Sequence, residues 1–537
     1  MKSTFLIFLI SLLSFLSVSA QRTDLIYSAE KLPEKETSKY KLEILTNGNT
    51  ANIGLNESVG FFCTLYDANK KTIAHTIVPT TFQVETVIMK SVFEINNEVV
   101  VFIVSSNKNA PVLSRYIFDG STGKLKKEDV ILIKVAWKTV MMVSEAEINY
   151  IIPSEFFIQK DPNSNYYAIS YFDFQAPDIN KRIEVIHFSP THEIITRAYF
   201  TNPESNYLKL HYVTMYVNGP KSVILSSFLY NTKLDKGKEE AACFYLSELK
   251  AGATNFKSVK AVETDYYHRA EAIFVFNGVT NKILLLSTIY SKGEKGKIGG
   301  YNVISQTLNL ETLALTELIN LHSEKLDAAY MAANSTKEHY KGFPQHYCIN
   351  SKGNAVILSE YISLIGGYTL AQKIGINCLT PEGQDIYGTT LHYMNSQGTK
   401  AISFMYTKGL NGQYTYSNYF DEFQDTYVGL VSGKSNSYLF LNNTVERFKM
   451  LENNVTPTFA TAISSNKPKF TSFIYTLNDV GIASKEYIFG KPVSEDVTKY
   501  CRFNTADYDP ATGLYAVIVV DKIKGKKTIS VLWMNLK

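Results

Sequence analysis

The chain has 537 residues, of which 45% are hydrophobic and 19% are charged, and its formal net charge is +4. This length exceeds one ordinary hydrophobic core, so it predicts several domains or a repeat array, and the composition excludes a disordered protein. A net charge this close to zero for a chain of this size gives no general attraction to nucleic acid, which we therefore exclude as a partner.

The chain begins with a segment typical of a secretory signal peptide. It has a positive Lys2, an apolar run at Phe5–Val18 and small residues up to Ala20. A membrane anchor is the weaker reading, because a helical span needs ~20 apolar residues and this run is shorter. No later run is long enough to cross a bilayer. We expect residues 1–20 to be removed and the protein to be exported, to the periplasm or outside the cell. The polar residues 21–38 then form a flexible lead-in.

Residues 39–537 predict one repeat domain. The clearest unit is Tyr266–Leu321, in which four apolar, β-rich runs are separated by turn residues. We call these runs strands A to D. Equivalent units of about 40–60 residues recur along the chain, and periods of this size are typical of propeller arrays. The 36 tyrosines and 31 phenylalanines favour such strands.

Three places depart from this order. Tyr40–Leu45 is a single strand, and the last unit, from Phe503 onward, has only three strands. Ser323–Ala333 is the one predicted helix, with Ser323 as its N-cap and Glu324 in its first turn.

The register is ambiguous between residues 392 and 451. Two hairpins, Ala401–Tyr419 and Tyr427–Leu441, either compete for one place in the repeat or occupy two places. A further unit is predicted at Thr458–Val497. The number of units is therefore seven or eight.

From its first strand to its last, the chain resembles β-propeller repeat proteins. The resemblance implies an all-β fold of about seven or eight four-stranded blades. The N-terminal strand, Tyr40–Leu45, would complete the last unit and close the ring, which removes an exposed sheet edge. No blade carries a Trp-Asp dipeptide or a double-glycine kelch signature. The resemblance therefore implies an architecture and no activity.

Lysine-rich loops recur between strands B and C, and such loops project from one face of a propeller. They are Lys233–Lys238, Lys292–Lys297, Lys408 and Lys522–Lys527. Of these, Lys236, Lys238, Lys295 and Lys297 are candidate binding residues for an acidic polymer, a charged glycan or an anionic membrane surface. The alternative is that lysines at hairpin tips keep exposed strand edges soluble.

Histidine and tyrosine recur side by side at or near the start of A strands. The pairs are His211-Tyr212, Tyr267-His268, His346-Tyr347 and His392-Tyr393. Because strand A is normally innermost, these side chains could ring the mouth of the central channel and bind a sugar, an anion or a metal. The alternative is that they fill the interior of the inner strands. His339-Tyr340 lies outside the register, so the dipeptide alone is a weak signal.

Catalytic signatures are incomplete. His192-Glu193 begins like a metalloprotease motif, but Thr196 stands where the second histidine is required. We assign no catalytic residue, no resident metal and no cofactor. The five cysteines have no C-x-x-C spacing and suit buried apolar positions, with Cys348 and Cys378 as the pair to check for a disulfide.

The leading hypothesis is a secreted, monomeric, non-catalytic propeller that presents one loop face to a protein or polysaccharide. The alternative is a propeller-type glycan hydrolase or lyase with its site at the channel mouth, which predicts two carboxylates facing a common cleft. A structural role in an envelope assembly is a third possibility and would need an exposed apolar patch.

Overall fold

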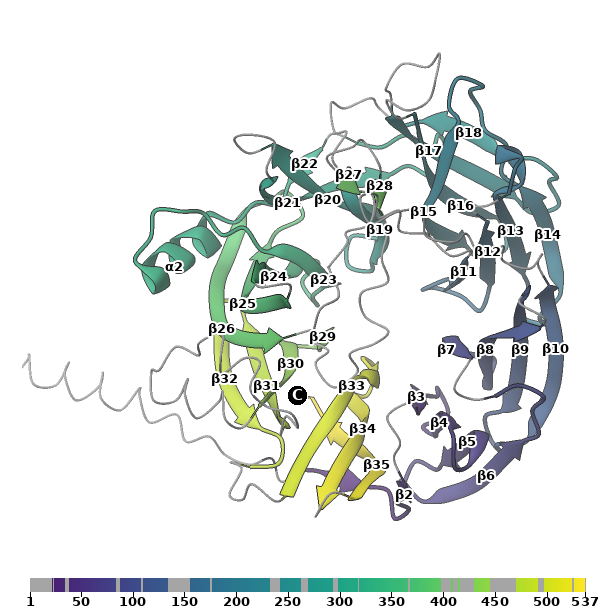
Figure 1. The fold of residues 1–537 in the computed structure, drawn as a ribbon, viewed down its shortest axis with the longest axis vertical. Coiled ribbons are helices and arrows are strands. Elements are labelled where there is room, and N and C mark those ends of the chain that lie inside the picture. Colours follow the sequence, from purple (N-terminus) through teal and green to yellow (C-terminus); the bar gives the residue numbers. More distant parts are fainter. Residues whose placement is uncertain are drawn as a thin grey trace, which may run out of the picture.

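The computed structural model describes residues 22, 24–33, 38–83, 87–107, 110–133, 155–173, 176–231, 242–261, 269–292, 298–316, 318–365, 368–396, 407–408, 414–415, 429–444, 470–490, 497–523 and 526–536. Across these residues, eight antiparallel sheets of four or five strands stand in a ring, and the first strand of each sheet lies nearest the ring axis (Figure 1). The all-β propeller is confirmed, with eight blades.

Seven blades are built from four consecutive strands each. Blades 1 to 3 are β3 (Lys39–Ile44), β4 (Thr50–Asn56), β5 (Gly60–Tyr66) and β6 (Thr72–Val78); β7 (Ile88–Ile95), β8 (Glu98–Asn107), β9 (Ala110–Asp119) and β10 (Leu125–Ile133); and β11 (Glu155–Lys160), β12 (Tyr167–Phe172), β13 (Ile183–Phe188) and β14 (Ile194–Tyr199). Blades 4 and 5 are β15 (Lys209–Asn218), β16 (Ser222–Tyr230), β17 (Ala242–Lys250) and β18 (Lys257–Lys260); and β19 (Arg269–Asn277), β20 (Lys282–Lys292), β21 (Ile298–Leu308) and β22 (Ile319–Asn320). Blades 6 and 7 are β23 (Phe343–Ile349), β24 (Ala355–Ile365), β25 (Tyr368–Leu379) and β26 (Asp385–Ser396); and β29 (Gly429–Ser432), β30 (Ser437–Thr444), β31 (Phe470–Asn478) and β32 (Gly481–Tyr487).

Blade 8 joins the two ends of the chain. Its strands are β33 (Val497–Asp509), β34 (Leu514–Ile523), β35 (Lys526–Asn535) and, on the outer edge of β35, the N-terminal strands β1 (Ile26–Tyr27) and β2 (Leu32–Pro33).

The N-terminal end of the chain therefore closes the ring, as predicted, but with different residues. Ile26 pairs with Trp533 and Leu32 pairs with Ile529 on β35. Tyr40–Leu45 is not the closing strand, because Lys39–Ile44 is the inner strand of blade 1. The closing strands lie within residues 21–38. An outermost strand faces water on one side and needs little apolar sequence, so its signal is weak.

Each blade packs face to face against its neighbours, and the second strand of a blade is buried on both faces. All seven residues of β4 and all nine residues of β16 are buried. This is why the B strands read as nearly continuous apolar runs, whereas an outer strand such as β6 has exposed or half-buried residues at every position but the last. The hydrophobic core is therefore a series of layers between blades.

The layer between blade 8 and blade 1 contains the one tryptophan that the structure describes. Trp533 is fully buried, its ring meets Tyr66 edge to face with 5.1 Å between ring centroids, and its indole N–H donates to Thr50 Oγ1 at 3.0 Å. An aromatic ring with a satisfied polar group suits a dry interface. This contact joins residues from opposite ends of the chain and stabilises the closed ring.

The ambiguous stretch at residues 392–451 resolves into one hairpin in a blade and one outside it. β29 and β30, which overlap the predicted hairpin 427–441, pair with β31 and β32 to make blade 7. The unit predicted at Thr458–Val497 is therefore only the second half of a blade. β27 (Thr407–Lys408) and β28 (Tyr414–Thr415), from the other predicted hairpin, form a separate two-stranded sheet.

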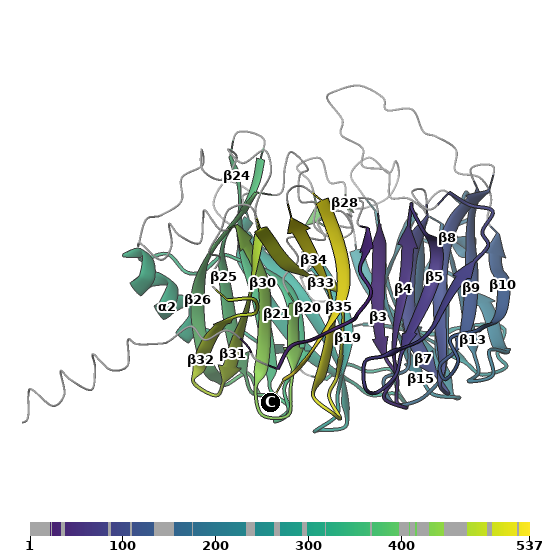
Figure 2. The ribbon, with the colours of Figure 1, turned by 90° about the horizontal axis from the view of Figure 1, so that it is seen from below.

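The predicted helix is confirmed as α2 (Glu324–Asn334), which stands outside the ring beside blade 6 (Figures 1 and 2). Ser323 is its N-cap and accepts a hydrogen bond from the Leu326 N–H at 3.0 Å. None of the helices in the described part of the chain has the length and apolar composition of a membrane span.

All five cysteines are free thiols, so the disulfide considered for Cys348 and Cys378 is absent. Burial raises the pKa of both thiols to about 12. They act as small apolar groups in the layer between blades 6 and 7.

Candidate functional site

The His-Tyr pair of blade 4 packs between blades. His211 and Tyr212 lie on the inner strand β15, and both are buried. The imidazole stacks on Tyr230, with His211 Nε2 2.7 Å from the Tyr230 hydroxyl, and burial lowers the pKa of His211 to about 3. Tyr212 stacks on Phe157 of blade 3 at 3.8 Å between ring centroids. These contacts fit the alternative reading, in which the pair fills the interior.

The other pairs do not share one position. His346 and Tyr347 lie on the inner strand β23, where burial lowers the pKa of His346 to about 4. The prediction that His392 and Tyr393 begin an A strand is wrong, because both lie on β26, the outermost strand of blade 6. Tyr267 and His268 lie outside the described residues. The role of the pairs as ligand contacts stays a prediction.

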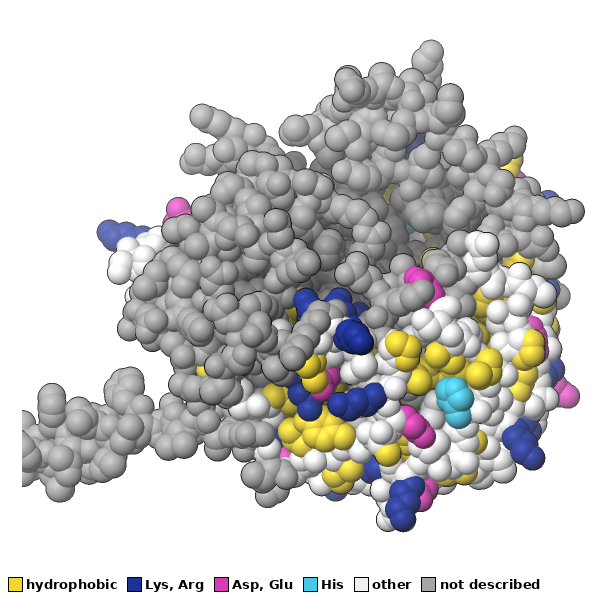
Figure 3. All heavy atoms as spheres, turned by 60° about the horizontal axis from the view of Figure 1, so that its bottom comes forward, with side chains coloured by type: hydrophobic (Ala, Val, Ile, Leu, Met, Phe, Trp, Pro, Cys, Tyr) yellow, Lys and Arg dark blue, Asp and Glu magenta, His cyan; other side chains and the backbone are white. Residues whose placement is uncertain are grey.

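Among the lysine-rich loops, only the one in blade 8 has side chains that the structure describes. Lys236, Lys238, Lys295 and Lys297 lie outside the described residues, and Lys408 lies on β27. In Figure 3, basic side chains gather among hydrophobic ones on the side of the molecule where blade 8 meets blade 1. The basic group of blade 8 consists of Lys31, Lys499, Lys522, Lys526 and Lys527.

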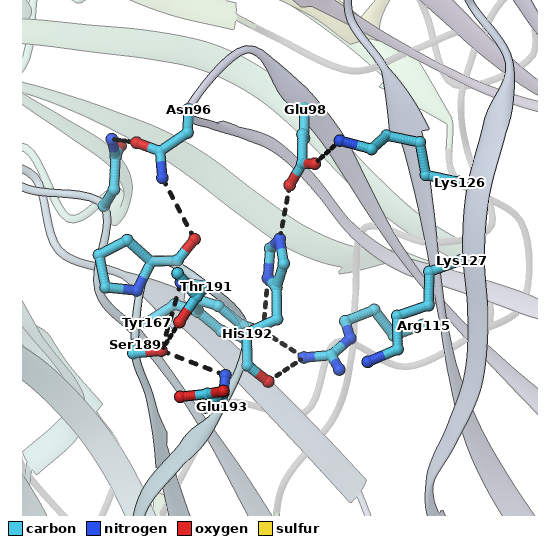
Figure 4. Close-up of polar contacts among 12 residues, drawn as sticks. Asn96, Glu98, Arg115, Lys126, Lys127, Tyr167, Ser189, Thr191, His192 and Glu193 are labelled. Atoms are coloured by element: carbon cyan, nitrogen blue, oxygen red, sulfur yellow. Dashed lines mark hydrogen bonds and ion pairs between the residues drawn. The ribbon is translucent and has the colours of Figure 1, made fainter.

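His192 and Glu193 lie in the turn between β13 and β14 (Figure 4). His192 Nε2 is 2.9 Å from Glu98 Oε2 of blade 2, and its Nδ1 is 3.1 Å from the Tyr167 hydroxyl. Arg115 of blade 2 donates to that hydroxyl and pairs with Asp129. These residue types could perform acid–base chemistry.

The centre of this network is buried. Arg115 and Tyr167 are only 2% and 0% exposed, and His192 is 9% exposed. Burial lowers the pKa of His192, which keeps the imidazole neutral between the two blades. We therefore assign the network a structural role as a polar connection between blades 2 and 3.

A cavity of about 260 Å³ lies between blade 8, with its N-terminal strands, and blade 1. Asn52, Tyr66 and His75 contribute polar groups to its wall, together with Glu30. Its volume is below the usual range of small-molecule sites, about 300–1,000 Å³. We assign it no ligand.

Acidic side chains gather on the inner strands of blades 8, 1 and 2. Glu43 is the second-to-last residue of β3, Glu94 holds the same place in β7, and Asp507 lies near the end of β33. All three are half-buried. We call Lys41, Glu43, Glu94 and Asp507 the inner-strand acidic site.

Backbone geometry positions these carboxylates. Asp507 Oδ2 accepts from the Ile44 N–H at 2.6 Å, and Glu43 Oε1 accepts from the Glu94 N–H at 3.0 Å. Asp507 and Glu43 thus each cap a backbone N–H on the inner strand of the next blade. The pairing of β33 with β34 is interrupted between Arg502 and Asp507, and such irregularities often redirect a side chain next to a functional site.

The environment disfavours ionisation of the carboxyl groups of Glu43 and Asp507. Burial, followed by the negative charge of Asp507, holds the pKa of Glu43 well above its usual range. Burial also raises the pKa of Asp507. Lys41 opposes both shifts, and its ammonium group donates to the Ala506 carbonyl at 2.8 Å. The negative charge of Asp507 therefore favours the protonated form of Glu43.

Sequence reasoning missed this site. The available signal was a glutamate before the last isoleucine of two successive A strands, in YKLEIL and KSVFEI. Asp507 had no such signal, because it joins the others only through the closed ring. The carboxylates also lie toward the ends of the inner strands, whereas the predicted His-Tyr ring was placed at the beginnings.

No protein-family model matches the chain, and no curated protein matches its sequence. Among solved structures, the chain is similar to an α-L-arabinanase from Penicillium chrysogenum complexed with arabinobiose, with 12% identity, a TM-score of 0.35, and coverage of 72% of this chain and 95% of that one. It is also similar to a polysaccharide lyase, with 9% identity, a TM-score of 0.39, and coverage of 95% and 100%. An ulvan lyase matches with 8% identity, a TM-score of 0.35, and coverage of 68% and 87%. At these TM-scores the likeness carries no argument about activity.

Proposed function

We propose that the protein cleaves glycosidic bonds in a polysaccharide and that the inner-strand acidic site supplies the acid and the base. The observation that carries the proposal is the placement of Glu43 and Asp507 on adjacent inner strands, each held by a backbone N–H of the next blade and each with a raised pKa. Glycosidic-bond cleavage needs one carboxyl group that keeps its proton at working pH and a second group that accepts one.

The two carboxyl groups have different roles in this proposal. Glu43, with the pKa held well above its usual range, keeps the proton and donates it to the leaving oxygen. Asp507 carries the negative charge of the singly protonated pair, and the Ile44 N–H holds that carboxylate in place. Asp507 then acts on a water molecule, in hydrolysis, or on a sugar C–H, in a lyase reaction.

The test uses the mature chain, residues 21–537, with a panel of neutral and acidic polysaccharides. New reducing ends measure cleavage, and ultraviolet absorbance of unsaturated sugars separates a lyase from a hydrolase. We expect Glu43→Gln and Asp507→Asn each to lower kcat by roughly 10²–10⁴-fold, whereas Glu338→Gln, at an exposed site on the linker after α2, keeps full activity. Circular dichroism verifies that each variant is folded.

Activity should also fall as pH rises through the raised pKa of the pair, because the acid must hold its proton. If no polysaccharide is cleaved, or if both carboxylate variants keep wild-type kcat, the proposal is wrong. The carboxylates would then serve only to cap the inner strands.

A second candidate function, binding without turnover, rests on the basic group of blade 8. Lys522 and Lys527 are paired across the β34–β35 hairpin, and Lys526 is exposed beside them. An acidic polysaccharide bound there would dissociate as salt rises, because exposed charges are screened within about 8–10 Å at physiological ionic strength. Binding that is insensitive to salt would contradict this role.

We also propose that the protein is exported as a monomer after cleavage behind Ala20. The sequence pattern of residues 1–20 supports this, and Arg22, just beyond the predicted cleavage position, donates to the Asn535 carbonyl at 2.5 Å. Intact mass of the protein recovered from the periplasm or medium tests the cleavage position. Light scattering tests the monomer.

A further inference from the structure

The segment between blades 5 and 6 brings together two histidines and an aspartate. His322 precedes α2, Asp327 lies in the first turn of the helix, and His339 follows its C-terminal end. His322 Nε2 is 3.1 Å from Asp327 Oδ2, and His339 Nδ1 is 2.6 Å from the same oxygen. One potential ligand atom from each of the three residues lies within 4.8 Å of the other two.

The helix that carries Asp327 is held firmly against blade 6. Its N-cap, Ser323, donates to the Asp385 carboxylate at 2.9 Å, and that carboxylate accepts from the Lys325 N–H at 2.7 Å. The backbone of Leu326 passes so close to Gly388 on β26 that a Cβ at Gly388 would lie 2.0 Å from the Leu326 nitrogen. The first turn of α2 therefore presents Asp327 from a rigid support.

A backbone hydrogen bond on the protein side fixes the orientation of the Asp327 carboxylate. Asp327 is 5% exposed, and its Oδ1 accepts from the Tyr340 N–H at 2.9 Å, which leaves Oδ2 directed at the two imidazoles. The side chains of His322 and His339 are 41% and 69% exposed. The cluster is thus closed on the protein side and open toward water.

We propose that His322, Asp327 and His339 form a divalent cation site, with Zn²⁺ as the ion that fits best. Two imidazoles and one carboxylate are a donor set that suits zinc, and zinc sites with three protein ligands keep a position for water or substrate. Ligand atoms about 2 Å from a tetrahedral ion stand roughly 3.3 Å apart. The 3.1 Å between His322 Nε2 and Asp327 Oδ2 is close to this value, whereas the exposed His339, now 2.6 Å from the same oxygen, would move outward to bind the ion. This proposal is independent of the carboxylates on the inner strands.

The ion would link the two ends of the segment that joins blade 5 to blade 6. His322 lies two residues after the end of β22, and His339 lies four residues before β23. A bound ion would hold these residues to α2 and would leave its remaining positions facing solvent. A small cavity of about 40 Å³ behind His322 and Asp327 has room for a bound water on the protein side.

The experiment is a zinc titration of the untagged mature chain by isothermal calorimetry, together with the visible spectrum of the cobalt-loaded protein. We expect one high-affinity equivalent of zinc, a d–d spectrum of a four- or five-coordinate cobalt ion, and a higher unfolding temperature with zinc. His339→Ala removes an exposed ligand and should weaken zinc binding at least tenfold. Glu338→Gln, which removes the neighbouring exposed carboxylate, should leave the affinity unchanged.

Two results would overturn the proposal. The first is a wild-type chain that binds no zinc and gives no cobalt spectrum at micromolar metal. The second is His339→Ala and Asp327→Asn variants that keep the wild-type affinity, which would place the bound ion elsewhere. Because His339 is largely exposed, its alanine variant tests the site without disturbing the fold.

Discussion

Glu360 is a buried carboxyl group that should make the protein less stable as pH rises. It lies on β24 in blade 6, is 4% exposed, and has no hydrogen-bond partner for Oε2 among the described residues. Burial raises the pKa of Glu360 from an ordinary value of 4.5 to about 7. The folded protein therefore keeps this proton over a pH range in which the unfolded chain has lost it.

The sign and size of the effect follow from this difference. Below pH 4.5 both states are protonated and the group costs nothing. As pH rises to about 7 the folded state binds more protons than the unfolded state, so the free energy of unfolding decreases. Because one pKa unit corresponds to about 1.4 kcal/mol, the loss reaches roughly 3 kcal/mol above pH 7.

The perturbation is Glu360→Gln, which keeps the shape of the side chain and removes its charge. We expect the variant to be more stable than wild type by up to roughly 3 kcal/mol at pH 8 and no more stable at pH 4. Urea unfolding at pH 4, 6 and 8 measures the difference. Glu338→Gln is the control, because its side chain is 69% exposed and should show no such trend.

Two outcomes would refute the reasoning. A gain of equal size at pH 4 and pH 8 would mean that the amide improves packing and that charge is irrelevant. An absence of any gain at pH 8 would mean that the folded protein solvates the ionised carboxylate well, so that the pKa is not raised.

Three further changes test the packing. Trp533→Ala should lower the free energy of unfolding by ~3–5 kcal/mol because it empties the layer between blades 8 and 1, whereas Val480→Ala, at an 84% exposed side chain, should change it by less than about 0.5 kcal/mol in a urea titration. Gly388→Ala should displace α2 and lower the melting temperature. Gly278→Ala is the control, because the nearest atom to an added Cβ is 3.6 Å away there. Equal melting temperatures for the two variants would contradict the close approach of Gly388 to α2. Burial lowers the pKa of His211 to about 3. As pH falls below 6.5, this histidine is therefore protonated in the unfolded chain but not in the folded protein, and the folded protein becomes less stable in acid. His211→Gln should therefore flatten the fall in stability between pH 6.5 and pH 4, and an unchanged slope would show that this imidazole does not contribute.

Local patterns in the sequence predicted the local structure well. The alternation of strands and turns was predicted, and in the turn between β7 and β8 both Asn96 and Asn97 have positive φ, as a two-residue hairpin requires. The helix with Ser323 as its cap was also predicted from neighbouring residues alone. These features depend on contacts between residues a few positions apart, so a single stretch of sequence contains the information.

The ambiguities of the sequence arose where a repeat unit is interrupted. β30 and β31 are neighbours in blade 7, but residues 445–469 separate them in the chain. The long connection inside the blade looks like a boundary between two blades, so the four strands of blade 7 are assigned to different units. Strand pairing decides the register there, and pairing across a long connection leaves no periodic signal.

Composition and periodicity by themselves determined that the chain is an all-β propeller, because the alternation of apolar runs and turns reflects hydrogen bonding between consecutive strands. They did not determine which side chains meet across the ring. Asp507 reaches Ile44 across 463 positions of sequence, and Ile26 pairs with Trp533. His339 meets Asp327 only because α2 docks against β26 and the chain then turns back. Such contacts depend on the closure of the ring and on the docking of one element against another, so only the tertiary structure decided where the acidic residues and the His-Asp-His cluster lie.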